Sequence, residues 1–118
     1  EYNSKDVPTA DGNVNGNIRF GQPGYMIVRV ALHEIAHTLG IGTSSEYRNL
    51  IADGVFTGAT ATALLKELDN DPNAVLKGDQ THFWPYGLNK EGEFNGEEDG
   101  IKHCKIVRAI LVDMGWVD

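Results

Sequence analysis

The stretch that decides the fold of this chain is ALHEIAHTLG, at residues 31–40 of 118. Apolar side chains recur there at three- and four-residue spacing, in a pattern that begins near Tyr25. Glycines follow at positions 40 and 42, and helices commonly end at such residues. We therefore expect a helix over about residues 25–39, buried because most of its faces are apolar.

The same stretch carries three side chains that can bind or move ions. His33 and His37 are four residues apart, just over one helical turn, so both imidazoles project from one face of the helix. Two neighbouring imidazoles can bind one zinc ion, and Glu34 beside them can take a proton from a metal-bound water. The alternative is a core helix whose two histidines and glutamate are satisfied by hydrogen bonds. Burying three titratable groups on one turn without a metal is costly, which favours the metal site.

The motif continues to Gly40, and His33-Glu34-x-x-His37-x-x-Gly40 resembles the zinc-binding motif of the metzincin clan of peptidases. The resemblance implies a zinc metalloendopeptidase that uses Zn²⁺ as cofactor and Glu34 as general base in peptide-bond hydrolysis. It also implies an edge strand before the motif helix, a turn beneath the metal and a C-terminal helix. Metzincins place a third zinc ligand three residues after the glycine. This chain has Thr43 there, which is not a usual zinc ligand.

The third ligand therefore has to come from outside the motif, because a catalytic zinc normally has three protein ligands. The turn expected beneath the metal falls near residues 82–89, the most aromatic part of the chain, and contains His82. We take His82 as the first choice, the alternative being a surface histidine on a loop held by its aromatic neighbours. The other candidates are His103, Glu67 and, more weakly, Asp79, Glu46 and Cys104.

Tyr86 lies in the same aromatic segment. In several metzincins a tyrosine near the turn approaches the metal, so the resemblance implies that Tyr86 helps catalysis. A phenol in that position can donate a hydrogen bond to an oxyanion as charge develops. The alternative is a tyrosine that only packs.

The rest of the chain predicts a small α+β domain built around the motif helix. We expect residues 1–17 to be loop, short strands at 17–20 and 55–57, polar turns at 43–54 and a second helix at 60–68 with Ala63, Leu64 and Leu68 inward. Residues 77–100, rich in glycine, read as a long loop. A C-terminal helix from 98 or 99 to 114 has its apolar face at Ile101, Cys104, Val107, Ile110 or Leu111, and Met114, and Gly115 ends it. We interpret residues 1–118 as a single domain, either a minimal version of the resembled fold or one whose N-terminal strands have been trimmed.

Composition limits the partners. The net charge of −7 argues against nucleic acid, and no apolar run approaches the roughly 20 residues of a membrane span. Cys104 is the single cysteine, so an internal disulfide is excluded. The chain begins at Glu1 without a methionine, and we interpret it as part of a larger, secreted, multidomain chain that acts on protein or peptide substrates.

Two other functions fit the same motif. One is a secreted module that binds carbohydrate or a cell surface, with a structural zinc and residues 83–86 as a stacking platform. The other is a zinc hydrolase such as a deformylase. That family takes a cysteine ligand from ahead of the helix, whereas Cys104 lies far behind it.

Overall fold

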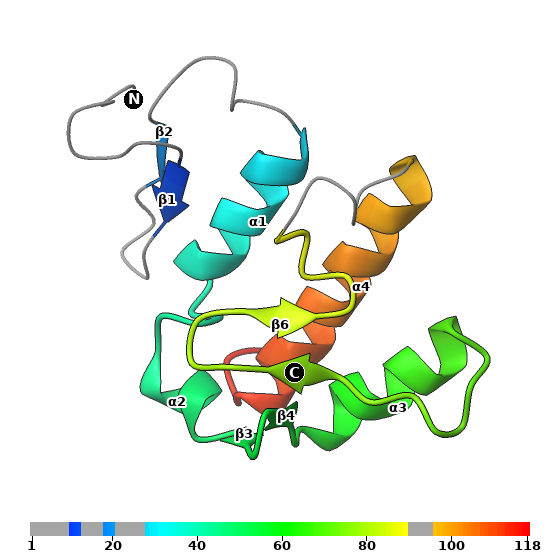
Figure 1. Cartoon of the computed structure of the whole chain (residues 1–118). Helices are drawn as coiled ribbons and strands as arrows, with labels where there is room; N and C mark the ends of the chain where they lie inside the picture. The colour runs from blue at the N-terminus through cyan, green and yellow to red at the C-terminus, as the bar shows by residue number, and fades with distance from the viewer. Residues whose placement is uncertain (1–9, 13–17, 21–27, 90–95) are drawn as a thin grey trace.

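The computed structural model describes residues 10–12, 18–20, 28–89 and 96–118 (Figure 1). These residues form an α+β fold with helices α1 (Val28–Thr38), α2 (Ser45–Arg48), α3 (Ala59–Leu68) and α4 (Glu97–Asp113). The strands are β1 (Ala10–Gly12), β2 (Ile18–Phe20), β3 (Ile51–Ala52), β4 (Val55–Phe56), β5 (Lys77–Gly78) and β6 (Phe83–Trp84). No helix among the described residues is long and apolar enough to cross a membrane.

Two antiparallel sheets flank the helices. Strands β1 and β2 pair with each other beside α1, and β3, β4, β5 and β6 form a second sheet in that order (Figure 1). The turn between β3 and β4 is Asp53-Gly54, whose φ angles of 52° and 78° give the two left-handed positions of a tight hairpin. The short strands therefore owe their pairing to turns and to the core beneath them.

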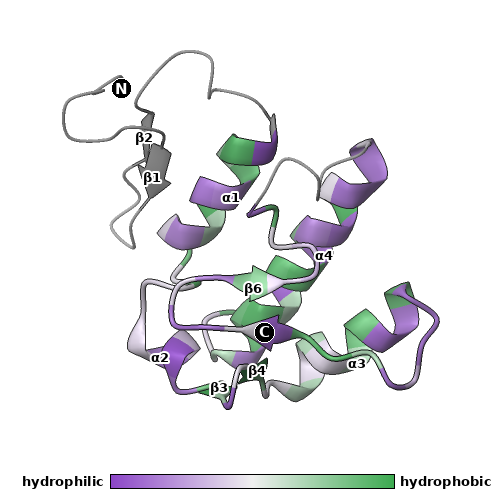
Figure 2. Ribbon diagram, in the orientation of Figure 1, coloured by the Kyte–Doolittle hydropathy of each residue, from purple (hydrophilic) through white to green (hydrophobic). Residues whose placement is uncertain are grey.

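The core lies where α3 and α4 pack together beneath the second sheet. Figure 2 shows the first turns of α4 as mainly hydrophilic and its later turns, which pass behind β6, as hydrophobic. The largest fully buried side chains are Tyr47, Phe56, Ile41, Leu65, Leu76, Leu88, Ile106, Ile110 and His103. The core cluster thus takes residues from all four helices and from β4 and β6.

The end of α4 also caps the start of α3. The N-cap residue of α3 is Gly58, which has no side chain to bond the free amides of the first turn. The Asp113 carboxylate accepts hydrogen bonds from the Thr60 and Ala61 amides instead, both at 2.9 Å. A negative charge at this position also interacts favourably with the helix dipole.

Several predicted elements are confirmed. The motif helix ends at Thr38, followed by Gly40 at a φ of 95°, although the predicted residues 25–27 lie outside the described part. The strand predicted at 17–20 is β2, with Asn17 outside the described residues, and the strand predicted at 55–57 is β4. The second and third helices differ from α3 and α4 by one or two residues at their ends, and Gly115 follows α4 at a φ of 80°.

Other predictions are wrong. Residues 10–12 form β1 instead of loop, and residues 43–54 contain α2 and β3. The segment 77–100 contains β5 and β6 and the start of α4, while residues 90–95 lie outside the described part. Strands of two residues carry no alternating pattern, so composition alone made this segment resemble a loop.

The predicted buried faces are also partly wrong. Ile101 and Cys104 of α4 are exposed, as is Ala63 of α3, where Leu65 is buried instead. On α1, Ile35 and Leu39 are 41% and 38% exposed, so that helix is covered on only part of its surface. Both α1 and α4 carry more apolar residues than the described core covers.

Candidate metal centre

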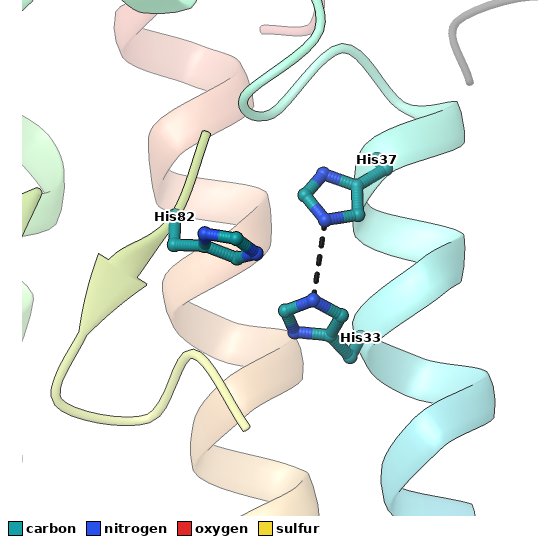
Figure 3. Close-up of side chains that lie close together, drawn as sticks. All are labelled: His33, His37 and His82. Carbon is teal, nitrogen blue, oxygen red and sulfur yellow. Dashed lines mark hydrogen bonds between the residues drawn. The ribbon is translucent and has the colours of Figure 1, made fainter. Parts of the chain in front are cut away.

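Helix α1 brings the imidazole rings of His33 and His37 into direct contact. The Nε2 atoms of His33 and His37 lie 3.2 Å apart, and the two rings meet edge to face with centroids 4.8 Å apart. Figure 3 shows both rings projecting from α1 toward His82. The spacing of the motif on a helix is sufficient to produce this pair.

The backbone fixes the orientation of both rings. His33 Nδ1 lies 3.0 Å from the Gly87 carbonyl oxygen, and His37 Nδ1 lies 2.8 Å from the Ile41 carbonyl oxygen. A carbonyl can only accept, so each ring donates through its Nδ1 and turns its Nε2 toward the other histidine. The two Nε2 atoms lie at hydrogen-bonding distance, 3.2 Å (Figure 3), which is also close to the spacing of two nitrogens that bind one metal ion. Hydrogen bonding of the distal ring nitrogen to a carbonyl is the usual arrangement of metal-binding histidines.

The third histidine comes from the loop between β5 and β6. The Asp79 carboxylate accepts hydrogen bonds from the amides of Thr81 and His82, at 2.8 and 2.7 Å, and so shapes this loop. The buried Tyr47 hydroxyl donates to the His82 carbonyl oxygen at 2.8 Å. The His82 ring stacks on His33 with centroids 5.1 Å apart and lies 5.4 Å from the ring of His37.

These three histidines form a cluster that can hold a metal ion. Their ligand atoms all lie within 4.8 Å of one another. Zinc–nitrogen bonds of 2.0–2.1 Å in tetrahedral geometry place ligand nitrogens about 3.3 Å apart, close to the spacing of the α1 pair. A small movement of the His82 side chain, which belongs to a loop, would complete the set.

Burial keeps His33 in the form that binds metal. Desolvation lowers the pKa of His33 to about 4, and the positive charges that His37, His82 and His103 can carry act in the same direction. The hydrogen bond to Gly87 acts in the opposite direction but is outweighed. His33 is therefore neutral at pH 7, with no proton to displace from its Nε2.

Glu34 lies in the same turn of α1 and is 6% exposed. Successive residues of a helix point about 100° apart, so its carboxylate leaves α1 beside the imidazole pair and not in line with it. Glu34 is not part of the histidine cluster.

The turn after α1 explains the glycine of the motif. Gly40 has a φ of 95°, and a Cβ there would overlap the ring of Trp116. Thr43, at the metzincin ligand position, donates its hydroxyl to the His37 carbonyl oxygen at 2.6 Å. Thr43 thus closes the C-terminal end of α1.

Tyr86 and His103 lie elsewhere. The Tyr86 hydroxyl donates to the Asp69 carboxylate at the end of α3, which raises its pKa to about 12. Its role as an oxyanion donor stays a prediction that this hydrogen bond does not support.

The His103 ring is 2% exposed and stacks on Phe83, and its nitrogens face the carbonyl oxygens of Tyr86 and Leu32. His103 is a core residue next to the site and not a member of the cluster.

The remaining candidate ligands are not gathered at the cluster. Glu46, Glu67 and Cys104 are exposed on α2, α3 and α4, and Asp79 acts through the backbone of the loop that carries His82. Sequence reasoning missed the carbonyl groups of Gly87 and Ile41 and the Tyr47 hydroxyl. The two carbonyls gave no signal, because every residue type has one.

Comparisons with known protein families, with curated proteins and with solved structures find no match to this chain. The fold and the cluster together define a small α+β protein in which three histidines lie close enough to hold one metal ion.

Proposed function

We propose that this chain is a zinc-dependent peptidase domain of metzincin-like type, in which His33, His37 and His82 bind the metal and Glu34 is the general base. The observation that carries the proposal is the pair of Nε2 atoms facing each other at 3.2 Å, with both Nδ1 atoms on carbonyl oxygens. Two imidazoles whose Nδ1 atoms donate to carbonyl oxygens can turn both Nε2 atoms toward one cation.

The donor set suits zinc. Three imidazole ligands match Zn²⁺, and also Cu²⁺, Ni²⁺ and Fe²⁺, better than Ca²⁺ or Mg²⁺, which prefer oxygen ligands. Three protein ligands, without a fourth among the described residues, are the number found in catalytic zinc sites. Zinc bound there would polarise a substrate carbonyl and lower the pKa of a bound water toward about 7.

We propose that Glu34 moves the proton. Its side chain is buried and belongs to the same turn of α1 as His33 and His37, and in this role it would accept a proton from a water at the cluster and return it to the departing amine. The carbonyls of Gly87 and Ile41 keep both rings in position throughout. We further propose that the chain is secreted as part of a larger protein and acts on protein or peptide substrates.

The test compares two matched substitutions in zinc-loaded protein. Glu34→Gln should retain bound zinc and lose at least about a hundredfold in hydrolysis of a mixed peptide library, because the base is removed. Glu67→Gln is the control, since Glu67 is exposed on α3. Equal activity of the two variants would contradict the assignment of Glu34, and a zinc-loaded wild type without hydrolysis would contradict the peptidase.

The binding-module alternative has one supporting observation, the 38% exposure of Trp84. Its neighbours do not extend a platform, because Phe83 is 3% exposed and the Tyr86 hydroxyl is held by Asp69. Glycan binding that is unchanged in Glu34→Gln and lost in Trp84→Ala would favour this alternative over the peptidase.

A further inference from the structure

Helix α4 has a second face that the described core does not cover. Its residues at 97, 100, 101, 104, 105 and 108 line a hollow of about 670 Å³, together with Leu32 of α1. The steps between these residues are three, one, three, one and three, which is a single helical stripe. All but Gly100 are exposed, and Ile101 is 49% exposed. In Figure 1, the first turns of α4 extend beside α1, whereas its later turns pass behind β6.

The spacing of residues along this stripe is symmetric: it reads the same from the N-terminal end of α4 as from the C-terminal end. About a midpoint between Lys102 and His103, position 97 mirrors 108, position 100 mirrors 105, and position 101 mirrors 104. When two copies of α4 lie antiparallel about a two-fold axis at this midpoint, each residue therefore faces its mirror position in the other copy. The facing pairs are Glu97 with Arg108, Gly100 with Lys105, and Ile101 with Cys104. A two-fold interface requires such a self-complementary surface.

The charged side chains at the two ends of the stripe are of opposite sign across that axis. Among the described residues no ion pair is formed by Glu97, Lys105 or Arg108, whereas Glu98 on the neighbouring face pairs with Lys102 at 3.6 Å. Arg108 donates to the Asp118 carbonyl oxygen at 3.4 Å, which leaves the rest of its guanidinium available. A second copy would give each of two arginines a carboxylate partner.

The centre of the stripe is apolar and has room for a partner. Ile101 and Cys104 lie in the middle, where burial would be most favourable, and Leu32 forms the floor of the hollow beside them. The sequence pattern predicted that Ile101 and Cys104 are buried, and packing against a second copy of α4 would bury them.

We propose that this chain forms a two-fold symmetric dimer through antiparallel packing of α4 against α4, with Glu97 facing Arg108 of the other copy. The interface comprises about three helical turns from each copy. This is at the low end of interface sizes, below about 1,200 Å² in total, so the dimer dissociates on dilution. The proposal is independent of the metal centre.

Charge reversal tests the register directly. Sedimentation equilibrium of the wild type between about 10 µM and 1 mM should show reversible association to twice the monomer mass. Glu97→Arg and Arg108→Glu should each weaken the dimer at least tenfold, because each creates two like-charged contacts. An equimolar mixture of these two variants should dimerise like the wild type, because each contact between unlike copies then joins opposite charges. The double variant Glu97→Arg/Arg108→Glu should also recover.

A cysteine cross-link tests the geometry independently. In the proposed dimer each Cys104 faces Ile101 of the other copy. The two Cys104 residues are therefore offset by three residues, about 4.5 Å along the helix axis, and the two helices lie about 8–10 Å apart. A short bismaleimide should therefore join the two copies in wild type and not in Cys104→Ser. A wild type that remains monomeric up to about 1 mM would overturn the proposal. A dimer that is unaffected by either charge reversal would also overturn it. So would failure of the mixed variants to associate, provided that circular dichroism shows each variant to be folded.

Discussion

The depressed pKa of His33 makes the stability of the metal-free chain depend on pH. An unfolded histidine takes up a proton near pH 6.5, whereas burial lowers the pKa of His33 to about 4. Between these values the unfolded chain binds more protons than the folded chain, so the free energy of unfolding falls as pH falls. Above about pH 6.5 the contribution is complete, and below about pH 4 it has been lost.

The magnitude follows from the gap between the two pKa values. At 1.36 kcal/mol for each pH unit, the apo chain loses about 3 kcal/mol of stability through His33 between pH 6.5 and pH 4. This is a large share of the roughly 5–15 kcal/mol that stabilises a typical domain. His33→Gln removes the titrating group, so the same interval should cost that variant about 3 kcal/mol less.

The assay is urea unfolding of chelator-treated wild type and His33→Gln at half-unit steps from pH 7.5 to pH 4. The two stability curves should diverge in slope below pH 6.5, with the wild type falling more steeply. Their difference reports the titration of His33 together with its coupling to the neighbouring histidines, because all other titrating groups are shared. Parallel curves over the whole range would refute the reasoning that His33 is held neutral by burial.

Three further predictions concern single substitutions. Asp113→Ala should lower the free energy of unfolding by about 1–2 kcal/mol in thermal or urea unfolding, because the first amides of α3 lose their cap, while Asp118→Ala should change it by less than about 0.5 kcal/mol. Gly40→Ala should cost about 1–3 kcal/mol because of its positive φ and the Trp116 ring, and adding Trp116→Ala should recover only the steric part. Tyr86→Phe should leave peptide hydrolysis within about twofold of wild type, and a loss near a hundredfold would instead restore Tyr86 to the oxyanion role.

The motif helix and its two histidines were predictable because their signal is local. A four-residue spacing on a helix determines how two side chains lie, whatever surrounds them. His82 was predicted for a different reason: a zinc site needs a third ligand, and the resemblance to metzincins implied a turn beneath the metal near residues 82–89. The structure brings His82 to the cluster, although its role as a ligand stays a prediction.

The rest was not predictable because it depends on contacts between distant segments. The strands that deliver His82 are two residues long, too short to show alternation. The Gly87 carbonyl that orients His33 is 54 residues away along the chain and carries no side-chain signal. Ile101 was placed in the core because α4 is apolar on more than one face, and periodicity does not tell which face a single copy buries.

The central claim is that three histidines bind one metal ion, and isothermal titration with zinc of wild type and His82→Ala tests it most directly. We predict one zinc per wild-type chain. The zinc affinity of His82→Ala should fall by more than the roughly 10- to 100-fold that is typical when a residue hydrogen-bonded to a metal ligand is replaced. His103→Ala is the matched control and should remain within that smaller range. Failure of the wild type to bind zinc, or binding by His82→Ala as tight as by the wild type, would contradict the claim.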